Sequence, residues 1–252
     1  IKDNDIFIKI NNKEIRLTND ADKEVNPTLS PVGNYVAYTK KNDLYCVSVA
    51  DQKEVRLTTD GSELIMNGYA SWVYMEEILG RASQYRAFWW SPDGKRIAFF
   101  RSDDTNVPEY MLTDAPGQHG IVDKIRYPKA GDPNPQVRVG IVLPTGSDVV
   151  WASFNPQDDQ YFGLPYWMPD GQNLLVQWMN RDQNELRIYK VNPETGLKSN
   201  FMTEAQKTFI SLDDEGKRIK FIDDELFIYR SDNSGYEQMY LYNMEGNLIN
   251  PI

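Results

Sequence analysis

The sequence has only one cysteine and one histidine, two residue types that often carry metal or nucleophilic chemistry. A single cysteine excludes an internal disulfide and every zinc site built from several cysteines. Cys46 lies in the alternating segment "DLYCVSV", so we interpret it as a small core residue of a strand. His119, in the segment "DAPGQHGIV", has no nucleophile nearby in sequence, and we interpret it as an ordinary loop residue.

Motifs for nucleophilic catalysis and for cofactors are also lacking. No Gly-x-Ser-x-Gly elbow occurs, so a complete Ser-His-Asp triad is not expected within these residues. There is no glycine-rich phosphate loop. The segment Arg230 to Gln238, "RSDNSGYEQ", superficially resembles a calcium loop but lacks the acid at the twelfth position, so we predict a polar hairpin loop. We therefore expect no metal and no cofactor.

Long apolar runs and an excess of positive charge are missing as well. No segment approaches the roughly 18 to 20 apolar residues that cross a bilayer, and the chain does not open on a signal peptide. Because 37 acids against 27 bases give a net charge of −10, phosphate backbones are repelled and nucleic acid is not an expected partner. The first residues already read as a strand, so the compartment stays open.

What the sequence does contain is a repeated strand–turn–strand pattern rich in aromatic residues. It occurs as "TLSPVGNYVAYTKKNDLYCVSV" and "WWSPDGKRIAFFRSDD", and more weakly as "YWMPDGQNLLVQW" and "FISLDDEGKRIKFIDDELFIYRS". In each copy a proline or acid followed by glycine predicts a tight turn, and the alternation after it predicts a strand. The marker glycines are Gly33, Gly94, Gly171 and Gly216, which are 61, 77 and 45 residues apart.

These repeats predict an all-β fold, namely an arc of a larger β-propeller. A plain four-stranded blade takes about 40 to 50 residues, so the first two intervals carry insertions, and long excursions from a regular β scaffold are where binding residues usually lie. The opening segment "DIFIKINNKEIRLTND" reads as the last two strands of another blade. We therefore expect about four blades with a partial one in front of them.

The first insertion contains "SWVYMEEILGRASQYRAF", for which we predict a short helix near residues 72–82. The apolar positions in it have helical spacing, with Glu76 and Glu77 on the opposite side; they are Tyr74, Met75, Ile78, Leu79 and Ala82. Paired acids on a helix usually face water, and periodicity alone favours that interpretation. If the pair lines a cavity instead, a primary ammonium with three donors would match the two carboxylates.

The segment "SWVYMEEILGRASQYRAFWWSPDGKRIAFFRSDDTNVPEYML", followed by "KIRYPKAGDPNPQVRVGIV", closely resembles the amino-terminal propeller of dipeptidyl peptidase IV, in the prolyl oligopeptidase family. The resemblance covers most of residues 1–252 and is most specific from Trp72 to Val142. It implies a fragment of an eight-bladed propeller whose carboxyl-terminal α/β-hydrolase domain is absent. Met75 and Ser71 depart from the family pattern, where acids are common. The family arginine that contacts the substrate carbonyl aligns before Ile1 and is not assigned.

The resemblance reverses the interpretation of the two acids. It implies that Glu76 and Glu77 bind the free amino group of peptide substrates, so that the parent serine peptidase releases Xaa-Pro or Xaa-Ala dipeptides, while this portion gates access. The fragment alone, without the triad, is expected to be inactive. The implied partners are the peptide substrate, the hydrolase domain and a second copy in a homodimer. The implied location is periplasmic or otherwise extracytoplasmic. The alternative is a non-catalytic propeller that serves as a protein-binding platform.

Overall fold

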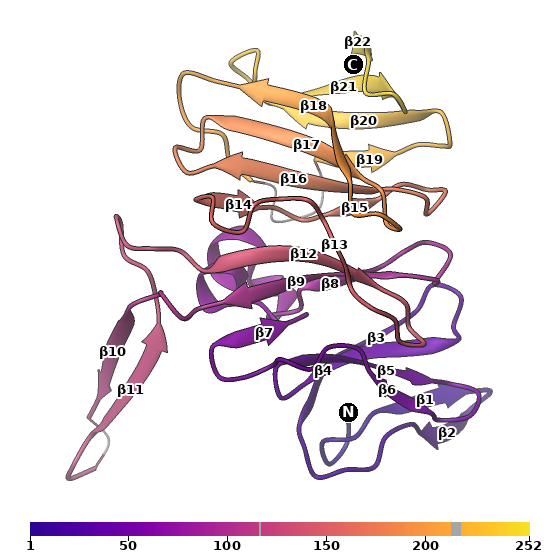
Figure 1. Ribbon diagram of the computed structural model, residues 1–252, viewed down its shortest axis with the longest axis vertical. Helices are drawn as coiled ribbons and strands as arrows, with labels where there is room; N and C mark the ends of the chain where they lie inside the picture. The colour runs from indigo at the N-terminus through magenta and orange to yellow at the C-terminus, as the bar shows by residue number, and fades with distance from the viewer. Residues whose placement is uncertain (116, 213–217) are drawn as a thin grey trace.

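The computed structural model describes residues 1–115, 117–212 and 218–252, which fold almost entirely into antiparallel strands. A short hairpin and four sheets follow one another from the N-terminal to the C-terminal end of the molecule (Figure 1). This arrangement confirms the prediction of an all-β propeller arc with four blades and a partial unit in front.

The strands of each sheet are as follows. The hairpin consists of β1 (Phe7–Ile10) and β2 (Lys13–Arg16). The first blade contains β3 (Glu24–Leu29), β4 (Tyr35–Lys40), β5 (Asp43–Ser48) and β6 (Glu54–Arg56). The second contains β7 (Ile65–Asn67), β8 (Phe88–Trp90), β9 (Ile97–Asp103), β12 (Gln136–Val142) and β13 (Val150–Trp151). The third contains β14 (Gln160–Phe162), β15 (Tyr166–Trp167), β16 (Leu174–Asn180), β17 (Glu185–Val191) and β18 (Lys198–Ala205). The fourth contains β19 (Ile219–Phe221), β20 (Leu226–Ser231), β21 (Gln238–Asn243) and β22 (Leu248–Pro251).

The predicted turns between the first and second strands of the first three blades are present. Gly33, Gly94 and Gly171 all have positive φ values, between 68° and 78°. Each glycine N–H donates over 2.9 Å to the carbonyl of the residue three positions earlier. Glycine adopts this left-handed conformation without a steric penalty, which explains its recurrence at this place in the repeat.

The fourth predicted turn is not tested by the structure. Gly216, the expected marker, lies outside the described residues. The next turn of this blade, at residues 222–225 between β19 and β20, is described, and in it the Ile222 N–H donates to the Leu226 carbonyl over 2.9 Å. An Asp223 side chain that accepts the N–H groups of Glu225 and Leu226 stabilises this turn without a glycine.

Hydrophobic clusters between neighbouring blades hold the arc together. Strand β9 shows how the sequence achieves this, because its run "IAFF" alternates between two clusters. Ile97 and Phe99 pack toward the first blade, whereas Ala98 and Phe100 pack toward the third. Such continuous apolar runs are expected when both faces of a strand are covered. Leu174 and Leu175 of β16 divide in the same way between the second and fourth blades.

The second predicted insertion forms a two-stranded arm of β10 (Glu109–Asp114) and β11 (Ile121–Arg126) that projects away from the blades (Figure 1). At its base lies Asp104, which is 5% exposed. Its Oδ1 atom is buried and has no hydrogen-bond partner among the described residues. Burial, reinforced by the neighbouring Asp103, raises the pKa of Asp104 to about 7, while Arg126 opposes the shift.

None of the helices among the described residues is long and apolar enough to cross a membrane.

Candidate functional site

The first insertion interrupts the first strand of the second blade. β7 and β8 both pair with β9, so together they take the place of one strand. Residues 68–87, which connect β7 to β8, form the insertion. The two ends of the insertion are joined by an antiparallel β-bridge between Tyr69 and Arg86 and by a hydrogen bond from the Ala87 N–H to the Gly68 carbonyl. β7 and β8 form one edge of the five-stranded sheet, so the insertion starts at an edge of the second blade.

The predicted helix over residues 72–82 is confirmed as helical but is divided into two turns. Its first part, η1 (Tyr74–Ile78), is a π-helical turn in which the Leu79 N–H donates to the Tyr74 carbonyl over 2.7 Å. Gly80, with a φ of 76°, ends this turn. A 3₁₀ turn, η2 (Arg81–Ser83), follows. Because positive φ is readily available only to glycine, Gly80 sets the boundary between the two turns.

The apolar side of η1 is packed between the second and third blades. Tyr74, Met75, Ile78 and Leu79 are each at most 8% exposed and belong to the largest hydrophobic cluster. The Tyr74 hydroxyl accepts a hydrogen bond from the Phe162 N–H over 3.1 Å, and burial raises the Tyr74 pKa. Ala82, which the helical spacing placed on the same side, is exposed because the chain changes direction at Gly80.

Glu76 and Glu77 lie on this firmly packed turn but differ in environment. The Glu76 side chain is 18% exposed, and the Arg81 guanidinium donates a hydrogen bond to its Oε1 atom. Arg81 itself is 78% exposed. Glu77 is exposed and makes no hydrogen bond or ion pair with the part of the chain that the structure describes. The turn thus presents two adjacent carboxylates, one already paired with a solvent-exposed cation.

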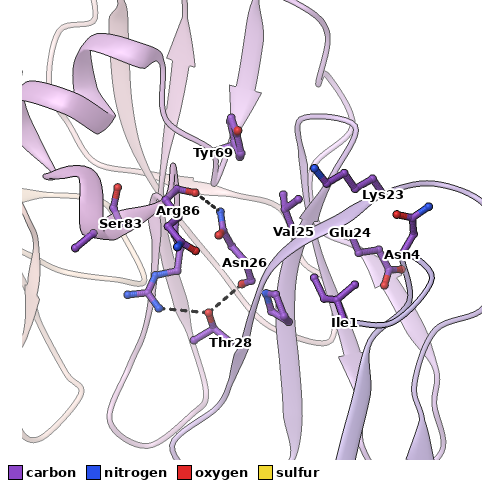
Figure 2. A pocket seen from close by; sticks show the side chains of 13 residues that line it. Ile1, Asn4, Lys23, Glu24, Val25, Asn26, Thr28, Tyr69, Ser83 and Arg86 are labelled. Carbon is purple, nitrogen blue, oxygen red and sulfur yellow. Dashed lines mark hydrogen bonds between the residues drawn. The ribbon is translucent and has the colours of Figure 1, made fainter.

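A pocket of about 570 Å³ lies between η2 and strand β3 of the first blade (Figure 2). Two hydrogen bonds cross between the blades here. The Asn26 side-chain amide donates to the Gln84 carbonyl over 3.1 Å, and the Arg86 guanidinium donates to the Thr28 hydroxyl over 3.4 Å. The insertion is therefore attached to the first blade on this side and to the third blade through Tyr74.

Two residues that follow η2 have left-handed backbone conformations. Gln84 and Tyr85 have φ values of 49° and 68°, which are costly for residues with large side chains. Surrounding contacts hold them there, because Tyr85 stacks on Tyr69 with ring centroids 4.9 Å apart and planes 1° from parallel. This rigid return of the chain fixes where the two acids stand relative to the blades.

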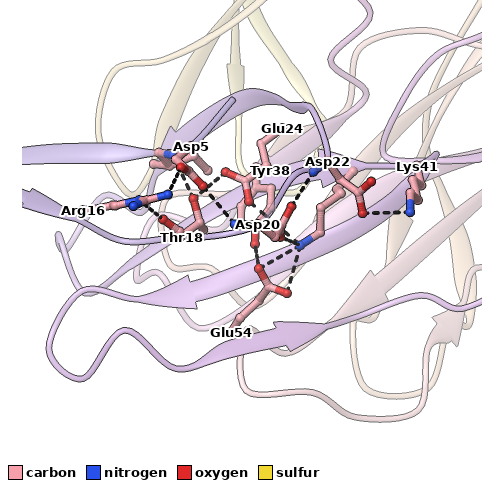
Figure 3. A network of polar contacts seen from close by, with 11 residues as sticks. Asp5, Arg16, Thr18, Asp20, Asp22, Glu24, Tyr38, Lys41 and Glu54 are labelled. Carbon is pink, nitrogen blue, oxygen red and sulfur yellow. Dashed lines mark hydrogen bonds and ion pairs between the residues drawn. The ribbon is translucent and has the colours of Figure 1, made fainter. Parts of the chain in front are cut away.

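A separate group of acids, Asp20, Glu24 and Glu54, lies close together at the first blade (Figure 3). The Lys40 ammonium lies 2.6 Å from Asp20, 3.0 Å from Glu54 and 3.9 Å from Glu24. Burial raises the pKa of the Glu24 carboxyl to about 7, despite a hydrogen bond from the Thr18 hydroxyl. Three carboxylates this close could hold a metal ion, but the lysine already supplies the positive charge. These residues fit an internal ammonium better than a metal.

The remaining sequence-based interpretations are confirmed. Cys46 is buried in β5, and burial raises the pKa of its thiol to about 12, which keeps it protonated and unreactive. His119 is an exposed residue of the turn between β10 and β11. Residues 232–237 form the hairpin loop between β20 and β21, whereas Arg230 and Gln238 belong to the two paired strands.

Sequence reasoning missed Arg81 as a neighbour of the two acids. Helical periodicity directs attention to positions three and four residues away, whereas Arg81 follows Glu76 by five. The available signal was Gly80, because a glycine after an apolar helical turn indicates that the chain reverses direction there. That reversal brings the guanidinium back to the carboxylate.

Comparison with known proteins identifies the architecture. A family model described as the dipeptidyl peptidase IV N-terminal region matches residues 1–252. The chain belongs to this family. Dipeptidyl peptidase 4 of Trichophyton tonsurans is 32% identical over 231 residues, which cover 86% of this chain and 29% of that protein. A probable dipeptidyl-aminopeptidase B of Chaetomium globosum is 33% identical over 178 residues, or 65% of this chain and 19% of that protein.

Solved structures agree with this assignment. The crystal structure of Porphyromonas gingivalis dipeptidyl peptidase 4 superimposes with a TM-score of 0.86 at 28% identity and covers 96% of this chain and 34% of that one. A putative dipeptidyl aminopeptidase IV from Bacteroides ovatus gives a TM-score of 0.76 at 28% identity and covers 97% of this chain. The chain thus spans about a third of these structures and less than a third of the two curated relatives.

Proposed function

We propose that this chain is the propeller portion of a dipeptidyl peptidase IV-like serine exopeptidase that releases Xaa-Pro and Xaa-Ala dipeptides from peptide amino termini. Glu76 and Glu77 bind the free α-ammonium group of the substrate. The observation that carries the proposal is the adjacent pair of acids on a packed helical insertion, which starts at the edge strand of a blade in a chain of this family.

The chemistry of the pair supports this role. Two neighbouring carboxylates repel each other and gain from a cation between them, and a primary ammonium offers three donors in a compact group. Each charge-assisted hydrogen bond of this kind contributes on the order of 1.5 to 3 kcal/mol. A cation held by one packed turn would be held at a defined position, because η1 is fixed against neighbouring blades.

A fixed position for the substrate amino group determines which peptide bond is cleaved. If the amino terminus is held at a set distance from a nucleophile, only the bond after the second residue reaches it, and a longer extension would collide with the insertion. The nucleophile, with its histidine and aspartate, is proposed to belong to a carboxyl-terminal α/β-hydrolase domain of the full-length protein. The propeller then measures the substrate and limits its access, at an extracytoplasmic location.

The deciding experiment compares Gly-Pro-anilide with its amino-acetylated form in the full-length protein. We expect rapid hydrolysis of the free amine and a loss of at least about a hundredfold on acetylation, because the cation is then absent. Equal hydrolysis of both substrates would contradict the amine-binding role. Hydrolysis of neither by a folded protein would favour the alternative of a non-catalytic binding platform.

The proposed homodimer is supported by the arm. One face of it exposes Tyr110, Leu112 and Ile121, which are 36%, 44% and 54% exposed, with Asp114 and Asp123 on the same face. Apolar residues exposed together usually mark a contact surface. A second copy of this chain is the proposed occupant, since an isologous contact needs no other partner.

A further inference from the structure

Resting on the proposed function, we propose that Arg81 is a displaceable internal counter-ion of Glu76 that sets the affinity for the substrate amine. It also selects peptides whose first residue is Asp or Glu over those that begin with Lys or Arg. The motivating observation is the ion pair from the Arg81 guanidinium to the Glu76 Oε1 atom on the inserted turn.

The two partners of this ion pair are held very differently. Glu76 stands on a turn whose apolar neighbours Met75 and Ile78 are 8% and 5% exposed, and only 18% of its side chain is exposed. Arg81 begins the next turn, after the break at Gly80, and is 78% exposed. Its side chain makes no other hydrogen bond or ion pair with the described part of the chain. The acid is therefore fixed, and the arginine is a tethered cation that can leave.

An arriving α-ammonium needs the acceptor that Arg81 occupies. Ion pairs with one exposed member are weak, so the guanidinium is displaced at modest cost. The apparent affinity for a ligand falls by the fraction of the protein in which its site is available. Arg81 thus weakens amine binding without touching the reacting atoms, and it acts on KM rather than on kcat.

Displacement leaves the guanidinium close to the bound amino terminus, because its backbone stays attached to the same turn through Gly80. The side chain of the first substrate residue branches from the carbon that carries the ammonium. A carboxylate on that side chain gives Arg81 a new partner in place of Glu76, whereas a second ammonium repels it. The chemistry therefore favours acidic first residues.

The test uses the full-length protein with Gly-Pro-, Asp-Pro- and Lys-Pro-anilides at low salt. We expect Arg81→Ala to lower KM for Gly-Pro-anilide about threefold, with kcat unchanged. We expect the wild type to prefer Asp-Pro over Lys-Pro about tenfold in kcat/KM, and Arg81→Ala to reduce this preference to about twofold or less. Arg81→Lys should keep the preference, since it keeps the charge.

Lys41→Ala is the matched control, because Lys41 is 71% exposed, pairs with Asp22 over 2.8 Å and lies in another turn. Lys41→Ala should change neither the KM for Gly-Pro-anilide nor the preference for Asp-Pro over Lys-Pro. If Arg81→Ala alters neither KM nor the Asp-to-Lys preference while Glu76→Gln lowers kcat/KM for the free amine, the inference about Arg81 is wrong and the proposed function stands. If Glu76→Gln has no effect either, both fail.

A protein that hydrolyses nothing still permits the test. Calorimetric binding of the dipeptides Gly-Pro, Asp-Pro and Lys-Pro then replaces kinetics, with the same shifts expected in Kd. Absence of binding by all three dipeptides would overturn the inference about Arg81 together with the amine site.

Discussion

The Tyr74 hydroxyl accepts a hydrogen bond from the Phe162 N–H over 3.1 Å, and this contact joins the insertion of the second blade to the first strand of the third. Tyr74 is 1% exposed and Phe162 is fully buried, so neither group can turn to water. The position of the two acids on η1 therefore depends on how two neighbouring blades pack.

Tyr74→Phe should lower the free energy of unfolding by about 1 to 3 kcal/mol, because the buried Phe162 N–H loses its acceptor. Urea titration followed by tryptophan fluorescence measures the change. Tyr236→Phe, at a position 80% exposed, is the control and should have almost no effect. An unchanged midpoint for Tyr74→Phe would mean that the hydrogen bond does not stabilise the contact between the blades.

Glu76→Gln and Glu77→Gln should each lower kcat/KM of the full-length protein for Gly-Pro-anilide about 10- to 100-fold, as expected for loss of one charge-assisted bond. Activity on the acetylated substrate should not change. Glu63→Gln removes an exposed acid from the same blade and serves as the control. Unchanged kcat/KM for both Glu76→Gln and Glu77→Gln would mean that these acids do not bind the substrate.

The buried carboxyl of Asp104 should make stability depend on pH. Its folded pKa of about 7 lies above the ordinary value of 3.8, so the folded chain retains a proton that the unfolded chain releases. The contribution of Asp104 to the free energy of unfolding is therefore fully present below pH 4 and is lost as pH rises through 7, a loss of about 4 kcal/mol at most. Asp104→Asn should flatten this decline relative to Asp148→Asn, an exposed control. Parallel pH curves for the wild type and Asp104→Asn would show that Asp104 titrates normally.

Replacing Lys40 should destabilise the fold, because the acids around it lose their counter-ion. Lys40→Met leaves Asp20, Glu24 and Glu54 without their cation and should lower the free energy of unfolding by about 3 to 5 kcal/mol. Lys41→Met, on the adjacent residue, is 71% exposed in the wild type and should cost little. Addition of calcium should not raise the melting temperature of the wild type, and a marked increase would instead identify a metal site.

The arm prediction concerns oligomeric state. Leu112→Asp should convert a dimer of the full-length protein to a monomer in sedimentation velocity, because a charge enters the exposed apolar face of β10. Leu197→Asp, at a position 66% exposed in another blade, should leave the dimer intact. Dimers that survive Leu112→Asp would place the contact elsewhere.

The sequence predicted the blades well because one local rule builds most of them. A positive-φ glycine after a short strand identified the turns at Gly33, Gly94 and Gly171. The corresponding turn of the fourth repeat, at Gly216, lies outside the described residues and stays a prediction. The later turn between β19 and β20 uses Asp223, which accepts hydrogen bonds from the backbone.

The candidate site was predicted less completely. Periodicity identified the buried side of η1 but assumed one uniform helix, and it therefore misplaced Ala82 and overlooked Arg81. Both errors arise at Gly80, where the chain changes direction before it returns to stack Tyr85 on Tyr69. Contacts between residues distant in sequence decide such details, and a single sequence does not display them.

Because β9 pairs with both β7 and β8, the insertion between them, residues 68–87, can be replaced as a unit. The continuous strand β9 is hydrogen-bonded to both short strands, β7 and β8. This pairing does not depend on the length of the chain that connects β7 to β8. Replacement of residues 68–87 would then change the proposed amine-binding insertion without altering the pairing of the blade. Specificity in this scaffold can evolve by replacing this insertion while the propeller around it stays the same.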